Sequence, residues 1–532
     1  MTIVSLPFFL FTAAVVLVYY AVPKKIRWTV LLAGSSIFYA LNSGWLALVL
    51  AGTSLLTFVM GWAVQKVLDA SRADLKAAEG LSREEKKKRK EAARKKARAL
   101  MLTGVLADLA ALLFLKYFNF FGSNLNRLLS ALGTGGRIPA LNLLLPLGIS
   151  FYTLQAMAYL IDVYRGKTAA DRNPAKFMLF MSFFPQIVQG PIPRHSQLAH
   201  QLYEGHDFDY QRLCFGAQLM LWGIFKKIVI AERLSGPVQA LFAADSAVTG
   251  PAVFLGACLY GLQVYTDFSG GMDIVRGVAQ MLGIELELNF TQPYFASSVE
   301  DFWRRWHITM GAWMRDYIFY PLSLSKAFTN LSRKSRKVFG AFVGKRLPAF
   351  LAMFIVYFLV GLWHGADWKY IVYGVWNGVF ITSGILLENA YAKARGLCGI
   401  DEGTVTWRAF RILRTFAIVS FGRYFSRADS LGHAMDLFRR TFIHWRDLSF
   451  LTDGTLLKWG LNTANWVLLA VCVLILFYVD ARHEKGISFR RTIAAQALPF
   501  RWLIYIGAVL ALLIFGCYGP EYSAASFIYE RF

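Results

Sequence analysis

The sequence predicts an all-α, polytopic membrane protein, and three observations support this fold class. The 532 residues are 56% hydrophobic and only 17% charged, which excludes a disordered chain and an ordinary soluble domain. Long apolar runs recur along most of the chain, at lengths that suit helices crossing a bilayer. The formal charge of +24 is concentrated in short segments between these runs, as the positive-inside rule expects, which argues against a nucleic-acid-binding protein.

The apolar runs give the expected helices in order. A bilayer core of about 30 Å needs about 20 apolar residues in a helix. Runs near that length, or shorter ones suited to protein-buried helices, lie at 4–22, 28–44, 46–64, 100–121, 141–164, 177–190, 212–231, 250–266, 349–363, 369–387, 408–425, 462–480 and 501–518. Because some are short or interrupted, we expect 11 to 12 transmembrane helices. The run at 177–190 contains Pro185 and predicts a re-entrant or broken helix.

Basic segments set the expected orientation of these helices. Lys and Arg cluster at 66–100, 326–346 and 482–501, which predicts that these segments are cytoplasmic. By the same rule the N-terminus and the end of the last span lie outside, and the first run is an uncleaved span because it lacks a basic n-region and a clear cleavage site. The stretch at 83–98 predicts a charged, helix-prone cytoplasmic loop, which either contacts anionic lipid or is a solvated spacer.

Two histidines, His307 and His364, are the residues for which the sequence predicts chemistry. An ionisable side chain at bilayer depth costs at least a few kcal/mol and tends to mark a functional path. His364 follows the apolar run 349–362 and precedes two small residues, Gly365 and Ala366, which permit close approach of a substrate. An imidazole can take a proton from an attacking hydroxyl and return it to a leaving group. The alternatives are a buried histidine satisfied by a carbonyl and, for His307, a structural role.

A helix is predicted from Ser298 onward, because serine is a favourable N-cap and Asp301 adds a negative charge to the first turn. At helical spacing, one face of this amphipathic, partly interfacial helix would carry Phe302, Trp306, Thr309, Met310 and Trp313. His307 would lie beside that face.

The remaining polar residues are less decisive. Asp267 and Asp273 follow an apolar run, and they are either loop acids at the bilayer edge or substrate contacts. The five cysteines are scattered without CxxC spacing, which is typical of cysteines used in packing. We therefore expect neither a disulfide framework nor a metal site.

Five motifs, taken together, resemble the membrane-bound O-acyltransferase (MBOAT) family. They are Pro146-Leu147-Gly148-Ile149-Ser150-Phe151-Tyr152, Phe183-Phe184-Pro185-Gln186-Ile187-Val188-Gln189-Gly190-Pro191-Ile192, Tyr265-Thr266-Asp267-Phe268-Ser269-Gly270-Gly271, Glu300-Asp301-Phe302-Trp303-Arg304-Arg305-Trp306-His307 and Leu362-Trp363-His364-Gly365. The likeness runs from about residue 5 to the C-terminus. It is closest to the bacterial branch that contains the alginate O-acetyltransferase membrane subunit and its peptidoglycan and teichoic-acid relatives.

The resemblance implies a ring of tilted helices around a central funnel, which joins a cytoplasmic donor entrance to an extracytoplasmic acceptor opening. It implies that His364 is catalytic and that His307 assists or positions near the same tunnel. Contacts of the tunnel or the substrate are expected from Asp267, Trp306, Trp363 and Asn377. The candidates for the oxyanion stabiliser are Asn377, Trp376 and a backbone N–H.

The predicted organisation has four parts. They are N-terminal transmembrane helices with the basic loop 66–100 (1–122), the MBOAT catalytic core (123–390), C-terminal transmembrane helices (391–518) and an extracytoplasmic tail (519–532). The tail ends in Phe527-Ile528-Tyr529-Glu530-Arg531-Phe532, which is similar to the F-x-Y-x-x-F motif of bacterial D-alanylation and related acyl-transfer systems. That likeness implies that the Tyr529 hydroxyl carries the acyl group transiently. The alternative is an interfacial aromatic anchor.

The function implied is a membrane O-acyltransferase of the bacterial inner membrane. It would pass an acyl group, for which we favour acetyl from acetyl-CoA, across the membrane for O-acetylation of an extracytoplasmic polysaccharide. No permanently bound cofactor is expected, and a separate SGNH-type esterase or transferase would complete the transfer. Three alternatives stay open: D-alanyl transfer from a carrier protein to teichoic acid, a transporter or flippase, and a non-catalytic scaffold.

Overall fold

The computed structural model describes residues 1–78, 82–134, 136–246 and 248–518. The chain divides into two compact units. Unit 1 comprises Met1–Met220 and Val275–Glu287, and unit 2 comprises Leu221–Ile274 and Leu288–Phe532. Within the described residues the secondary structure is helical apart from one isolated bridge between Phe290 and Trp306. The predicted all-α fold class is confirmed.

Unit 1 holds the N-terminal helices. They are α1 (Leu6–Ala21), η1 (Lys24–Ile26), α2 (Arg27–Ser43), η2 (Gly44–Leu46), α3 (Ala47–Ala77), α4 (Arg83–Leu112), η3 (Leu113–Tyr117), α5 (Phe118–Ala131), α6 (Ile149–Arg165), α7 (Pro174–Ser182), α8 (Phe184–Gln189) and α9 (His195–Tyr203). Two further helices, α10 (Tyr210–Ile224) and α12 (Pro251–Met281), contribute residues to both units.

Unit 2 holds the remaining helices. They are η4 (Phe225–Ala231), α11 (Ser235–Leu241), η5 (Pro293–Phe295), α13 (Val299–Arg305), α14 (Ile308–Met314), η6 (Arg315–Phe319), α15 (Tyr320–Ser323), α16 (Lys326–His364), α17 (Trp368–Leu386), α18 (Glu388–Leu397), α19 (Val405–Arg427), α20 (Leu431–Thr441), η7 (Ser449–Leu451), η8 (Thr455–Trp459), α21 (Thr463–Glu484), α22 (Phe489–Ala494) and α23 (Leu498–Phe515).

Several helices are long and apolar enough to cross a membrane. Among the described residues there are six such stretches, or seven if the bent pair α17–α18 counts as one span. The six are Lys24–Ala77, Arg83–Ala131, Tyr210–Leu241, Lys326–His364, Thr463–Glu484 and Leu498–Phe515. The first stretch joins α2 and α3, so a stretch can hold more than one helix. The chain is a multi-pass membrane protein, and the count of 11 to 12 spans stays a prediction.

The surfaces of α21 and α23 explain why these helices need lipid. Both helices expose large apolar side chains, among them Leu474, Phe477, Leu513 and Ile514. In water each such side chain would forgo about 1.5–3 kcal/mol of burial free energy. An apolar environment removes that cost, which agrees with their assignment as membrane spans.

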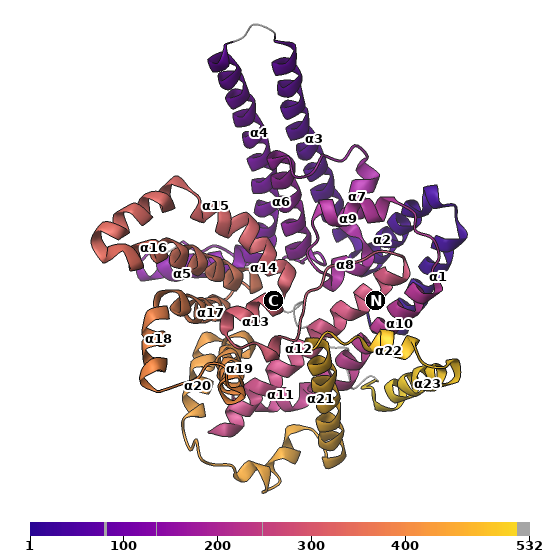
Figure 1. The fold of residues 1–532 in the computed structure, drawn as a ribbon, viewed down its shortest axis with the longest axis vertical. Helices are drawn as coiled ribbons and strands as arrows, with labels where there is room; N and C mark the ends of the chain where they lie inside the picture. The colour runs from indigo at the N-terminus through magenta and orange to yellow at the C-terminus, as the bar shows by residue number, and fades with distance from the viewer. Residues whose placement is uncertain (79–81, 135, 247, 519–532) are drawn as a thin grey trace. The chain divides into compact units, whose positions relative to one another are not determined.

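In unit 1, α3 and α4 run side by side (Figure 1). Ser82 caps α4: its hydroxyl accepts a hydrogen bond from the Glu85 N–H at 3.2 Å, and the Glu85 carboxylate accepts one from the Ser82 N–H at 2.9 Å. This capping box starts the helix at the basic stretch, which is therefore continuous with the apolar part of α4. The helical tendency predicted for 83–98 is confirmed.

Two of the sequence motifs meet in unit 1. Gly148 has a φ of 72°, and a Cβ on it would lie 2.5 Å from the Ile187 carbonyl oxygen, so only glycine fits between α6 and α8. The segment containing Pro185 forms two short helices, α7 and α8, broken at Phe183. The predicted broken helix is confirmed. The residues at the break are buried in protein, as a break at membrane depth requires, because it leaves backbone N–H and C=O groups without partners in the helix.

In unit 2, α12 continues without interruption through Asp267, Gly270, Gly271 and Asp273, where loop acids at the bilayer edge were one of the two interpretations of the sequence. A Cβ on Gly270 would lie 2.7 Å from the Gly223 carbonyl oxygen, and one on Gly223 would lie 2.4 Å from the Gly270 carbonyl oxygen. The glycines therefore serve helix packing and not chain reversal. The loop interpretation of this segment is wrong, because glycine at a close helix crossing produces the same local sequence as glycine in a turn.

Candidate active site

The segment that carries His307 is not one continuous helix. Ser298 caps α13 as predicted, since its hydroxyl accepts a hydrogen bond from the Asp301 N–H at 3.0 Å. The helix ends at Arg305, and Trp306 is extended and pairs with Phe290. The predicted single helix from Ser298 to Trp313 is therefore wrong: its N-terminal turn is correct, and a bridge to a distant segment breaks it.

His307 adopts a left-handed backbone conformation, with φ 49° and ψ 51°. Such a conformation is uncommon for a non-glycine residue and persists only where the surroundings enforce it. Backbone hydrogen bonds on both sides enforce it here, from the Thr291 N–H to the Arg305 carbonyl at 3.0 Å and from the Ile308 N–H to the Asn289 carbonyl at 3.1 Å. The imidazole is consequently placed by the bridge and is only 1% exposed.

Asn289 also fixes the tautomer of His307. Its Oδ1 accepts hydrogen bonds at 3.0 Å from the Thr309 N–H and from the Thr309 hydroxyl, and it lies 3.3 Å from His307 Nδ1. Because a backbone N–H can only donate, the Asn289 atom that faces it is the oxygen, and His307 Nδ1 must donate to it. Burial lowers the pKa of His307 to about 3, so the ring is neutral and Nε2 carries the lone pair.

One face of α12 supports this arrangement. The ring of Phe268 meets the His307 imidazole edge-on, with 5.0 Å between centroids. Met272, one turn later, receives a hydrogen bond from Asn289 Nδ2 to its sulfur at 3.6 Å. The motif around Asp267 therefore contributes an apolar wall through its neighbour Phe268.

His364 is the last residue of α16 and lies in a group of aromatic residues that includes Trp363 and Tyr373. Its ring centroid is 5.2 Å from that of Trp363 and 5.8 Å from that of Tyr373. Trp363 also lies 5.9 Å from His307, so one indole contacts both imidazoles. The structure thus brings His307 together with Trp363 and His364, which lie 56 and 57 positions later in the chain.

Tight packing of α16 against α17 orients His364. A Cβ on Gly361 would lie 2.4 Å from the Tyr370 carbonyl oxygen, and one on Gly365 would lie 2.3 Å from the Tyr370 ring. The small residues beside His364 therefore make room for Tyr370, where the sequence suggested room for a substrate. His364 itself is 6% exposed.

Asn377, on α17, holds neighbouring residues in place. Its Oδ1 accepts a hydrogen bond from Trp303 Nε1 at 3.1 Å, and its Nδ2 donates to the Tyr373 carbonyl at 2.8 Å. Trp376 Nε1 donates to the Ile418 carbonyl at 3.0 Å. These bonds give both residues a structural use, and their role as oxyanion donors stays a prediction.

Two acidic residues of α21 bond to neighbours of Trp306. Glu484 Oε2 accepts a hydrogen bond from Arg305 Nη1 at 2.7 Å, and Arg305 precedes Trp306 in the chain. One turn earlier, Asp480 Oδ2 accepts a hydrogen bond from the Tyr265 hydroxyl at 2.8 Å, and the Tyr265 ring lies 6.1 Å from that of Trp306. Sequence reasoning missed these residues and Asn289, because no local pattern links them to their partners.

Comparisons with known proteins bear on the identity of this site. The family described as MBOAT, membrane-bound O-acyltransferase, matches residues 169–396, which include both histidines. The probable alginate O-acetylase AlgI of Pseudomonas aeruginosa is 31% identical, over 88% of this chain and 78% of that protein. The chain belongs to the membrane-bound O-acyltransferase family. It is therefore an O-acyltransferase, and the transporter and scaffold alternatives are set aside.

Other relatives differ in the acyl group or acceptor in their names. The peptidoglycan O-acetyltransferase of Helicobacter pylori is 29% identical, over 64% of this chain and 64% of that protein. The teichoic acid D-alanyltransferase of Bacillus subtilis is 26% identical, over 56% of this chain and 72% of that protein. The resemblance of the five motifs to the MBOAT family is confirmed.

Two site predictions for this MBOAT protein remain, Asp267 and Tyr529. Asp267 forms a buried ion pair with Lys227 of η4, and Lys226 Nζ lies 2.7 Å from Asp273 Oδ2. Both acids are within α12. Of the two alternatives the loop acids are therefore wrong, and substrate contact by Asp267 stays a prediction. Tyr529 lies outside the described residues. No group of three or more His, Cys, Asp or Glu side chains in the described ranges is arranged to hold a metal.

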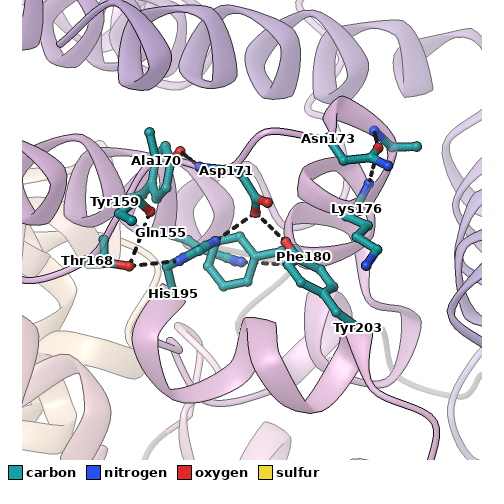
Figure 2. Close-up of polar contacts among 12 residues, drawn as sticks. Gln155, Tyr159, Thr168, Ala170, Asp171, Asn173, Lys176, Phe180, His195 and Tyr203 are labelled. Carbon is teal, nitrogen blue, oxygen red and sulfur yellow. Dashed lines mark hydrogen bonds and ion pairs between the residues drawn. The ribbon is translucent and has the colours of Figure 1, made fainter. Parts of the chain in front are cut away.

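A second histidine cluster lies in unit 1 (Figure 2). His195 Nε2 lies 2.9 Å from Asp171 Oδ2, and His195 Nδ1 lies 3.1 Å from the Thr168 hydroxyl. The Tyr203 hydroxyl donates to the same Asp171 oxygen at 2.5 Å, and Figure 2 shows the carboxylate between the two rings. Burial, followed by the charge of Asp171, raises the pKa of Tyr203, so that hydroxyl keeps its proton. The cluster ties the segment after α6 to α9.

Proposed function

We propose that this MBOAT protein transfers an acetyl group from cytoplasmic acetyl-CoA, across the bacterial inner membrane, for O-acetylation of an extracytoplasmic polysaccharide. The observation that carries the proposal is the contact of both imidazoles, His307 and His364, with the single indole of Trp363. Two histidines at one buried aromatic group provide a proton acceptor and a fixed partner in a space that excludes water. Relatives named as alginate O-acetylases support acetyl transfer to a polysaccharide.

His364 is the proposed general base. Its imidazole takes the proton of an attacking hydroxyl while the hydroxyl oxygen bonds to the carbonyl carbon of the thioester. The carbon–sulfur bond then breaks, and the same proton returns to the sulfur, so coenzyme A leaves as a thiol. His307, whose neutral ring is fixed through Asn289, assists by holding its Nε2 lone pair in a constant direction.

Tyr529 is the proposed first acceptor. Its hydroxyl would become an aryl ester, and a separate SGNH-type partner would move the acetyl group from that ester to a glycan hydroxyl, which regenerates the tyrosine. The last described residues support this reading because they are anchored in unit 2, the unit that contains both histidines. Arg233 Nη2 donates to the Phe515 carbonyl at 2.8 Å, and the Cys517 N–H donates to the Ile228 carbonyl at 3.0 Å.

Labelled acetyl-CoA added to inverted membrane vesicles tests this proposal. We expect label on the wild-type protein, none on Tyr529→Phe, and none on His364→Ala. Wild-type labelling that persists in His364→Ala would contradict the base assignment, and labelling that persists in Tyr529→Phe would contradict the carrier assignment.

A separate experiment compares acetyl-CoA with a D-alanyl-loaded carrier protein as the acyl donor. D-alanyl transfer is the second candidate because D-alanyltransferases are among the relatives. A D-alanyl-loaded carrier protein supplied in place of acetyl-CoA should give no label on the wild-type protein. Label from the carrier and none from acetyl-CoA would replace acetyl by D-alanyl in the proposal.

A further inference from the structure

A buried arginine contacts one neighbour of His307 and one neighbour of His364. Arg423 belongs to α19 and is 3% exposed. It follows residue 396, where the match to the family ends. The proposed acyl transfer by His364, His307 and Tyr529 does not use this permanent positive charge.

The packing of α19 against α17 turns Arg423 inward. A Cβ on Gly422 would lie 3.0 Å from Trp376 Cδ1, so the two helices approach closely at this position. Trp376 Nε1 donates to the Ile418 carbonyl of α19 at 3.0 Å, which fixes the register of the two helices. Arg423 consequently projects towards the aromatic group that holds the two histidines, and not towards lipid.

The described contacts of Arg423 link the two histidines. The guanidinium carbon lies 4.8 Å from the centroid of the Trp306 ring, over its face. Nη1 donates to the Tyr373 hydroxyl at 3.3 Å. Trp306 precedes His307 in the chain, and Tyr373 packs against His364. One side chain therefore contacts a neighbour of each imidazole.

A buried guanidinium is costly to keep if it serves packing alone. Removing a charge from water carries a desolvation penalty, and a well-packed apolar side chain of similar size is often neutral or stabilising in its place. A cation over an indole and a hydrogen bond to a hydroxyl are directional, and they define a distance between two side chains better than apolar contact does.

We propose that Arg423 is a positioning residue for acyl transfer, which holds Trp306 and Tyr373 so that His307 and His364 keep their relative placement. The inference rests on the proposed function, because it assigns Arg423 a task only if the two histidines act together. Arg423 acts through these two aromatic residues, and so it is not a catalytic residue.

The test compares Arg423→Met and Arg423→Lys in full-length protein in membranes. For Arg423→Met we expect kcat to fall about 10- to 100-fold, since small displacements of reacting groups cost this much. KM for acetyl-CoA should stay within about two-fold of wild type, and the thermal midpoint should not fall, because a buried charge has been removed. Arg423→Lys keeps the charge over the indole and should recover part of the lost kcat.

Arg440→Met is the matched control. Arg440, on α20, is a partly buried arginine that pairs with Asp436 at 3.0 Å and donates a hydrogen bond to the Ser246 carbonyl. It has no described contact with Trp306, Tyr373, His307 or His364. This variant should lower the thermal midpoint and leave kcat unchanged. Tyr373→Phe removes only the hydroxyl bonded to Arg423, so it tests the same contact if Arg423→Met does not fold, and its smaller loss of kcat should not add to that of Arg423→Met.

Two results would overturn the proposal. One is wild-type kcat in Arg423→Met, and the other is a loss of kcat that only follows the amount of folded protein. His364→Ala, measured in the same series, separates the two proposals. If His364→Ala is inactive and Arg423→Met is fully active, the role of Arg423 fails and the proposed function stands. If His364→Ala is active, the proposed function itself fails, and the role of Arg423 fails with it.

Discussion

The two histidine clusters differ in what surrounds the imidazole. In unit 1, His195 has a carboxylate at one ring nitrogen and a hydroxyl at the other, within an aromatic group that includes Tyr159 and Phe180 at 4.9 Å. In unit 2, His307 is fixed through one nitrogen by a neutral amide and is neutral. The carboxylate of the first cluster joins chain segments, whereas the amide of the second orients a neutral ring that can still exchange a proton.

Among the residues by which the two clusters differ, substitution of His307 should lower kcat the most. We expect His307→Ala to lower kcat about 100- to 1000-fold, within the range for a group that assists proton transfer. Steady-state rates with acetyl-CoA in vesicles measure this. His307→Asn is the milder companion, because its amide can still bond to Asn289. Full activity in His307→Ala would remove the distinction between the two clusters.

Substitution of Asn289 should have the second-largest effect on kcat, since Asn289 sets the orientation and tautomer of His307. We expect Asn289→Leu to lower kcat about 10- to 100-fold, as is typical when a residue that orients a functional group is lost. Asn289→Asp retains an acceptor for Thr309 and His307 and should keep more activity than Asn289→Leu. Equal losses in the two variants would mean that the acceptor is not the important feature.

The ion pair between Arg305 and Glu484 should have a smaller effect. Glu484→Gln weakens a contact at 2.7 Å that restrains the residue before Trp306, and we expect kcat to fall about 3- to 10-fold because one of several restraints is lost. Glu388→Gln is the control, since Glu388 pairs with Arg346 at the same 2.7 Å but on an exposed surface. Equal rates in the two variants would exclude α21 from the support of the site.

The sequence predicted much of the fold and only part of the site. The all-α class, the broken helix at Pro185 and the cap at Ser298 follow from composition and local rules. The helix break at Trp306 could not be predicted, because a bridge to Phe290 outweighs the regular spacing of the aromatic residues. Asn289, Arg423 and Glu484 were missed because no local pattern links them to the His307 segment. Asn289 is 18 positions from His307, and Glu484 is 179 positions from Arg305.

His195 should have the smallest effect on activity. We expect His195→Gln to keep kcat within about two-fold of wild type and to lower stability by about 1–3 kcal/mol, through the loss of a hydrogen bond to a carboxylate. Thermal unfolding in detergent measures the stability change. A stable His195→Gln protein with greatly reduced kcat would show that the cluster of unit 1 takes part in the reaction.

The most direct test measures His364→Gln and His195→Gln side by side. Both substitutions remove an imidazole from an aromatic group, and the same vesicles with labelled acetyl-CoA report the initial rate of acyl transfer. We predict background transfer for His364→Gln and at least half of the wild-type rate for His195→Gln at equal amounts of folded protein. Transfer near the wild-type rate in His364→Gln would contradict the assignment of the active site to unit 2.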